Sequence, residues 1–120
     1  MLASLQIRRR AEPVTVVTVQ TPVDLGQGVS ALITEAEGTT VVVSIAEAER
    51  RGWPIDFRAA WLTVSVHSSL SAVGLTAALS AVLSDRGIAC NVLAGYHHDH
   101  LLVPLELADE AIESLEALAG

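Results

Sequence analysis

The clearest pattern along the chain is an alternation of apolar and polar residues over 61–67. A period of two places successive side chains on opposite faces of a β-strand. The pattern therefore predicts a half-buried strand whose apolar face meets a core. The apolar face is Leu62, Val64 and Val66, and the polar face is Thr63, Ser65 and His67.

Helical spacing follows this strand. Leu75, Leu79 and Val82 recur at the i, i+4 and i+7 positions of one helix face. Ser71 is a suitable N-cap, and Arg86-Gly87 is typical of a last turn. The spacing predicts a helix that returns the chain across the sheet.

The rest of the second half alternates again and then becomes helical. We expect a strand over 88–94, a turn over 95–98 and a strand over 101–105. Apolar residues at helical spacing then predict a closing helix with one buried stripe. The stripe consists of Ala111, Ile112, Leu115 and Leu118.

The first half is rich in β-branched residues. Runs over 14–19 and 39–45 read as strands, and 31–34 pairs with the second run across the turn at Glu37-Gly38. Residues 21–30 read as a loop. Residues 46–51 are expected to form a short helix, followed by a linker over 53–58.

From residue 61 onward the expected order is β-α-β-β-α, a ferredoxin-like βαββαβ unit without its fourth strand. Because a bare sheet edge invites misassociation, another part of the chain should cover it. We interpret 13–58 as a degenerate second copy that lends a strand to the clearer unit over 59–120. Residues 1–12, with their Arg8-Arg9-Arg10 run, are expected to be a flexible, solvated arm. The predicted fold class is α+β.

Composition excludes several functions. Hydrophobic residues make up 51% of the chain, which supports a packed core. The formal charge of −7 repels polyphosphates, so a nucleic-acid partner is not expected. Neither a signal peptide nor a long apolar run is apparent, so we expect a soluble cytoplasmic protein that does not bind membranes. The single cysteine, Cys90, is interpreted as buried and inert.

Three runs of residues carry a family resemblance: HSSLSAVGLT over 67–76, GIACNV over 87–92 and AGYHHDHLLVP over 94–104. They resemble the small bacterial ACT-domain family long labelled a domain of unknown function, which is similar to the ACT modules of aspartate kinases and of CASTOR-type arginine sensors. The resemblance covers 61–118 most strongly and is compatible over 13–58. It implies two tandem ACT-like units on a ferredoxin-like fold, side-by-side association, and binding of an amino acid or similar small effector.

The expected topology brings the end of the first strand, the start of the first helix and the 95–100 turn together. A helix N-terminus suits a carboxylate, and a nearby acidic group such as Asp99 suits an ammonium. Gly74 would allow close approach of a ligand, and Asn91 could donate or accept a hydrogen bond. In the structural alternative these residues only cap the helix and satisfy the turns. The predicted ligand-binding residues are His67, Ser68, Ser69, Val73, Gly74, Leu75, Asn91, Gly95, Tyr96, His98, Asp99 and His100.

Two other chemistries use the same residues. His67, His98 and His100 could supply nitrogens to a transition metal, although short His-rich tracts are only compositional hints. Ser68 or Ser69 could act as a nucleophile, but no nucleophile elbow is present and adjacent strand residues point to opposite faces. We therefore expect no catalytic activity and no cofactor.

The leading hypothesis is a small-molecule-binding regulatory module whose effector is an amino acid. Such a module acts when its ligand prefers one conformation or association state over another. Its expected partners are a second copy in a homodimer and a separate enzyme or transporter that it regulates. The alternative is a ligand-free interaction or scaffold module, and the third reading is the histidine metal site.

Overall fold

The structure is a computed structural model that describes residues 5–66 and 72–119. The chain folds into two compact units. The smaller unit spans Glu12–Ala59, and the larger unit combines the segment up to Ala11 with the chain from Ala60 onward. Both contain antiparallel strands and helices, so the predicted α+β class is confirmed.

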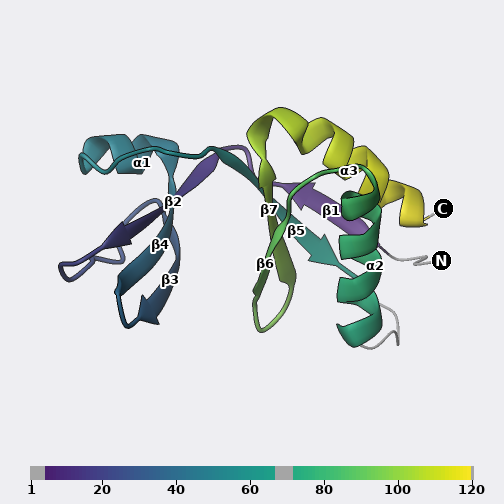
Figure 1. Cartoon of the computed structure of the whole chain (residues 1–120), viewed down its shortest axis with the longest axis horizontal. Helices are drawn as coiled ribbons and strands as arrows, with labels where there is room; N and C mark the ends of the chain where they lie inside the picture. Colours follow the sequence, from purple (N-terminus) through teal and green to yellow (C-terminus); the bar gives the residue numbers. More distant parts are fainter. Residues whose placement is uncertain (1–4, 67–71, 120) are drawn as a thin grey trace. The chain divides into compact units, whose positions relative to one another are not determined.

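The larger unit is a sheet with helices on one side (Figure 1). Its strands are β1 (Gln6–Arg9), β5 (Ala59–Ser65, beginning at the last residue of the smaller unit), β6 (Asn91–Ala94) and β7 (Asp99–Pro104), in the order β1-β5-β7-β6. Its helices are α2 (Ala72–Asp85) and α3 (Ala108–Glu116), with short 3-10 turns at Leu105–Leu107 and Ala117–Ala119 flanking α3. The predicted order from residue 61 onward is confirmed.

Strand β1 completes this sheet and corrects the expectation of a flexible arm where the structure describes that segment, at residues 6–9. It pairs antiparallel with β5 over Gln6↔Ser65 to Arg9↔Leu62, in the place of the missing fourth strand. Leu5 and Ile7 pack into the core, and Arg9 bonds Asp109 on α3 at 2.8 Å. The closing strand therefore comes from residues 6–9 and not from 13–58. The arginine run obscured the alternation of Leu5 and Ile7 with Gln6 and Arg8.

The core of the larger unit lies between the sheet and its two helices. The apolar face predicted for β5 is there, since Leu62 is fully buried and Val64 is 2% exposed. Leu101 and Val103 of β7 meet it, and α2 and α3 contribute Leu79, Leu83, Ala111 and Leu115. Burying each large aliphatic side chain stabilises the fold by about 1.5–3 kcal/mol. This packing fixes the ends of β5 and β7 where the site is found.

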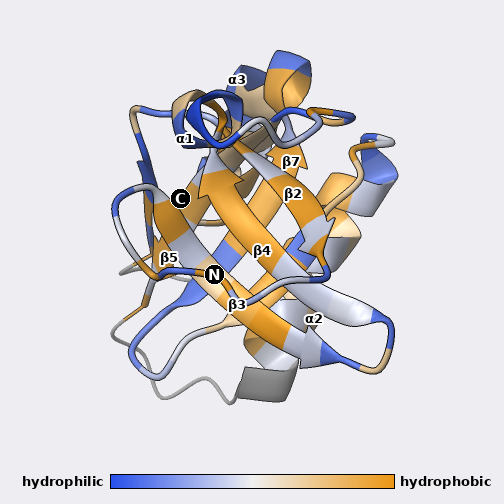
Figure 2. Cartoon of the chain, turned by 90° about the vertical axis from the view of Figure 1, so that its left-hand side faces the viewer, coloured by the Kyte–Doolittle hydropathy of each residue, from blue (hydrophilic) through white to orange (hydrophobic). Residues whose placement is uncertain are grey.

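The smaller unit has a three-stranded antiparallel sheet and one short helix. Its strands β2 (Val14–Val19), β3 (Val29–Glu35) and β4 (Gly38–Ser44) are ordered β3-β4-β2, and α1 (Ile45–Arg50) follows β4 directly. The predicted hairpin and short helix are thus confirmed. Figure 2 shows hydrophobic residues concentrated in these strands and polar residues in α1 and the turns.

Within the smaller unit, Val17, Val41, Val43 and Ala48 form a separate small core. It is built almost entirely from valines because the strands supply β-branched residues at alternate positions. Across the ranges 5–66 and 72–119, no helix is long and apolar enough to cross a membrane.

Candidate functional site

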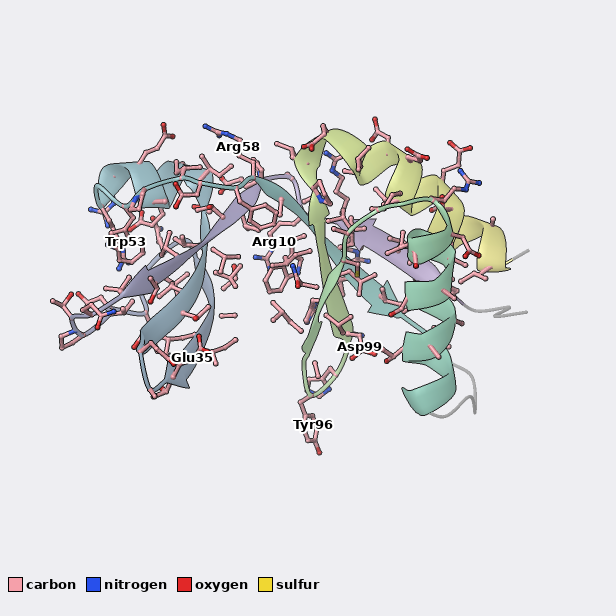
Figure 3. The ribbon with its side chains drawn as sticks, in the orientation of Figure 1. Arg10, Glu35, Trp53, Arg58, Tyr96 and Asp99 are labelled. Atoms are coloured by element: carbon pink, nitrogen blue, oxygen red, sulfur yellow. The ribbon has the colours of Figure 1, made fainter. Side chains whose placement is uncertain are left out.

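A pocket of about 250 Å³ opens in the larger unit where β5, α2 and the β6–β7 hairpin meet. We call it the hairpin pocket. Its floor is aliphatic and its rim is the polar hairpin, on which Tyr96 and Asp99 are labelled in Figure 3. The lining residues are Val64, Val66, Leu75, Gly95, Tyr96, His97, His98 and Asp99.

Local chain geometry positions the rim. The β6–β7 register pairs Ala94 with Asp99, and the Gly95 N–H donates to the His98 carbonyl at 3.0 Å. A Cβ on Gly95 would lie 2.7 Å from that carbonyl oxygen and 3.0 Å from the His100 Nε2. Only glycine fits this close approach without displacing backbone. The hairpin therefore holds His98 and Asp99 at fixed places on the rim.

Five of the predicted residues line the hairpin pocket. They are Leu75, Gly95, Tyr96, His98 and Asp99. Gly74 precedes Leu75 on α2, while Asn91 and His100 lie on β6 and β7 outside the pocket's described lining. His67, Ser68 and Ser69, and the predicted N-cap Ser71, fall outside the described residues. Val73 lies on α2, but its side chain is not described.

The face of the sheet opposite the core carries a polar cluster that sequence reasoning missed. Trp61 Nε1 donates to Thr63 Oγ1 at 3.2 Å, and that oxygen lies 3.0 Å from His100 Nδ1. The Trp61 and His100 rings are 4.9 Å apart, and the Arg10 guanidinium lies 4.2 Å from the Trp61 ring centre. We call these four residues the Trp61 cluster.

A second imidazole-hydroxyl contact continues the pattern, because Ser65 Oγ lies 3.4 Å from His98 Nδ1. Thr63 and Ser65 are the polar face that the β5 alternation predicted, and β7 is the neighbour of β5. The sequence does not show the strand order. That order brings Ser65 to His98, which is 33 positions away in the chain, and Thr63 to His100, which is 37 positions away. With that order known, the alternation alone would have indicated the pairs.

Burial lowers the pKa of His100. The nearby charges of His98 and Arg10 lower it further, and Asp99 opposes them. The imidazole is therefore held toward its neutral form, in which one ring nitrogen accepts and the other donates.

A metal site receives no support within residues 5–66 and 72–119, which contain no group of three His, Cys, Asp or Glu side chains placed to hold an ion. His98 and His100 each lie against a hydroxyl instead. The third residue of that hypothesis, His67, and the candidate nucleophiles Ser68 and Ser69 are outside the described chain. The metal reading and the nucleophile reading both stay untested predictions.

The hairpin pocket joins an apolar floor to one carboxylate and two imidazoles. Val64, Val66 and Leu75 can bury the carbon atoms of a small molecule, while Asp99 and His98 can bind polar groups at its open side. Such a combination is typical of a binding site for a small amphipathic molecule. The fold and this pocket together define an α+β module with a small pocket that is lined by aliphatic and polar side chains.

A protein-family model described as ACT domain matches residues 56–117, more than half of the chain. The protein belongs to the ACT domain family. ACT domains are regulatory rather than catalytic modules. The match covers all of β5, α2, β6, β7 and α3, the elements that build the hairpin pocket.

The solved structures similar to this chain include the following two. A protein of unknown function from Vibrio cholerae, VC0802, described as a possible transport protein, has 35% identity and a TM-score of 0.90, over 99% of this chain and 93% of that one. The Agrobacterium tumefaciens protein Atu0741 has 16% identity and a TM-score of 0.66, over 97% and 90%, and shows the fold alone. A comparison with curated proteins gives no significant match.

Proposed function

We propose that the protein is a small-molecule-binding regulatory module whose effector is an amino acid held in the hairpin pocket. The observation that carries the proposal is the meeting of an aliphatic floor with Asp99 and His98 on the rim, in a chain of the ACT domain family. The module acts through ligand-dependent conformation or association and performs no catalysis.

The chemistry of the pocket suits the three parts of an amino acid. Val66 and Leu75 can contact an aliphatic side chain, and Asp99 can accept hydrogen bonds from the ammonium. His98 can donate to the carboxylate, because one imidazole nitrogen carries a proton in either protonation state. The volume of about 250 Å³ lies below the usual range for drug-sized ligands, which favours a small effector.

We also propose a branch of the family to which the protein belongs, its oligomeric state and the kind of partner it regulates. We place the protein in the small bacterial branch that is similar to the ACT modules of aspartate kinases and CASTOR-type sensors, and propose a cytoplasmic homodimer. It would regulate a separate enzyme or transporter. A transporter is supported by the description of the Vibrio cholerae relative as a possible transport protein.

The test is a thermal-shift screen of the full chain against the twenty amino acids, with and without zinc. A ligand that binds only the native state at one hundred times its Kd stabilises the protein by about 2.7 kcal/mol. Asp99→Asn keeps the shape of the side chain and should lose most of this shift. Asp85→Asn, at the end of α2 and outside the pocket, is the matched control and should keep it. A shift that survives in Asp99→Asn would contradict the site.

A ligand-free interaction module is the second candidate, and one observation favours it. Tyr96 is 98% exposed at the tip of the β6–β7 hairpin, in a chain with a single tyrosine. Aromatic side chains are enriched in protein interfaces, where they often provide much of the binding energy. No shift with any amino acid would favour this candidate, and a shift with zinc alone would favour the histidine site.

A further inference from the structure

The smaller unit contains a pocket of about 520 Å³, larger than the hairpin pocket and built from other residues. We call it the Arg50 pocket. It lies where Glu12, two residues before β2, meets the end of the 21–28 loop and the β4–α1 junction. Its lining residues are Glu12, Gln27, Gly28, Ser44, Ala46, Glu47 and Arg50.

One wall of the Arg50 pocket is a clamped ion cluster. Glu47 has a side chain that is only 10% exposed, and its two carboxylate oxygens bind two arginines. Arg50 donates from Nε to Oε1 at 2.9 Å and from Nη2 to Oε2, and Arg51 donates from Nε to Oε2 at 2.6 Å. These hydrogen bonds lower the pKa of Glu47 to about 2, so the carboxylate is charged at neutral pH.

The clamp fixes the guanidinium of Arg50. Its Nε and Nη2 face Glu47, and Nη1 takes part in neither of these bonds. The Arg50 side chain is 68% exposed and lines the pocket. Because the bonds to Glu47 already orient the guanidinium, its remaining N–H donors have a fixed direction. A pre-oriented guanidinium loses less conformational freedom when it binds a carboxylate than a mobile one does.

The loop that forms the facing wall is seated tightly against this cluster. Gly28 has a φ of +84°, and a Cβ there would lie 2.6 Å from the Glu47 Cβ and 2.9 Å from the Ser44 Oγ. The Ser44 N–H donates to the Gly28 carbonyl at 2.8 Å. The adjacent Gln27 lines the pocket beside Gly28. On the other side, the Ile45 N–H donates to the Pro13 carbonyl at 3.1 Å and holds the segment that carries Glu12.

The Arg50 pocket carries both a positive and a negative charge, and this combination favours a ligand that has one charge of each sign. Glu47 is offset by one of its two arginines, which leaves one net positive charge in the cluster, and Glu12 adds one negative charge to the lining. A simple anion would meet Glu12, and a simple cation would meet Arg50. A small molecule with both charges satisfies both groups.

We infer that the Arg50 pocket is a second binding site of this protein and that it takes a small zwitterion of the α-amino-acid class. The ligand carboxylate binds Nη1 of Arg50, and its ammonium binds the carboxylate of Glu12. The site is independent of the hairpin pocket, so the chain carries one binding site in each of its units.

The experiment maps amide chemical shifts of the full-length ¹⁵N-labelled chain during titration with each of the twenty amino acids. Acetate and ethylammonium are titrated as probes that carry only one of the two charges. The expected result is that one or more amino acids shift the amides of Gly28, Ser44 and Glu47, and that neither single-charge probe does so at equal concentration. Effects at the hairpin pocket are read separately, at the amides of Val66, Leu75 and Gly95.

Variants test the assigned contacts. Arg50→Gln and Glu12→Gln should each weaken binding at Gly28 and Ser44 by about tenfold or more, because each removes a charge-assisted hydrogen bond. The matched controls Arg58→Gln and Glu49→Gln change exposed charges outside the pocket and should leave the affinity unchanged. Arg50→Lys retains the positive charge but lacks the planar pair of N–H donors of a guanidinium. We expect this variant to bind the amino acid with an intermediate affinity.

Several outcomes would overturn the second site. Shifts confined to the hairpin pocket would reject it while supporting the proposed function. Equal shifts with acetate would reject the zwitterion, and full affinity in Arg50→Gln would reject the contact. If no amino acid shifts either set of amides, both proposals fail. Loss of folding in Arg50→Gln would be visible as collapse of the whole spectrum, in which case Glu12→Gln decides.

Discussion

The two units hold their pockets in different ways. In the larger unit, an aliphatic floor continues the leucine-rich core and a tight hairpin sets the polar rim. The smaller unit has a small valine core, and one wall of its pocket is an ion cluster at a short helix. The comparison teaches that one pocket depends on packing and chain geometry, whereas the other depends on charge. Changes in packing, backbone and pH should therefore separate them.

The largest effect is expected from the core beneath the hairpin pocket. Leu101→Ala removes a fully buried side chain of β7 and should lower the free energy of unfolding of the larger unit by about 2–5 kcal/mol. Denaturant unfolding followed by Trp61 fluorescence in a Trp53→Phe background measures that unit. Tyr96→Ala, at a fully exposed position, is the control and should stay within about 0.5 kcal/mol. An equally small effect of Leu101→Ala would contradict the assignment of the core.

An intermediate effect is expected from the backbone beside the Arg50 pocket. Gly28→Ala places a Cβ against Glu47 at a left-handed φ and should destabilise the smaller unit by about 1–3 kcal/mol. Gly52→Ala has a similar φ of +73° but open space around the added carbon, so it should cost less. Unfolding monitored by Trp53 in a Trp61→Phe background compares the two. Equal costs would show that the contact with Glu47 contributes nothing.

The sequence predicted most of the elements because period-two and helical spacings are local signals. It missed β1, although Leu5 and Ile7 alternate with Gln6 and Arg8, because a four-residue strand beside an arginine run resembles a solvated arm. Only pairing with β5 across more than fifty residues shows otherwise. Short strands are stabilised by their neighbours and not by their own composition.

The candidate sites also differ in whether local sequence signals or contacts between distant residues form them. Five of the eight residues that line the hairpin pocket were among the predicted residues, because topology alone brings the end of β5 to the 95–100 turn. The Trp61 cluster and the Arg50 pocket were not predicted, since they need a strand order and a loop conformation. Glu47, Arg50 and Arg51 have the i, i+3 and i, i+4 spacing of helix ion pairs, which gives no indication that Gly28 packs against them.

The smallest effect, and the sharpest distinction between the units, is expected from pH. In the smaller unit the pKa of Glu47 is lowered from 4.5 to about 2. The unfolded chain then binds a proton that the folded chain does not. The stabilisation is complete above about 4.5 and is lost as the pH falls toward 2. Glu47→Gln should remove this dependence, as seen in Trp53 fluorescence, because Arg51 lies 5.0 Å from that ring.

In the larger unit the same reasoning applies to His100 at a higher pH. Its pKa is lowered from the ordinary value of 6.5, so the unfolded chain again takes up a proton first. The stability of this unit should be complete above that value and should decline as the pH falls below it. His100→Gln should flatten the decline, whereas His97→Gln, on the exposed hairpin, should retain it. If both units lost stability over one common pH range, the clamp of Glu47 and the burial of His100 would not be separate determinants of the stability of the two units.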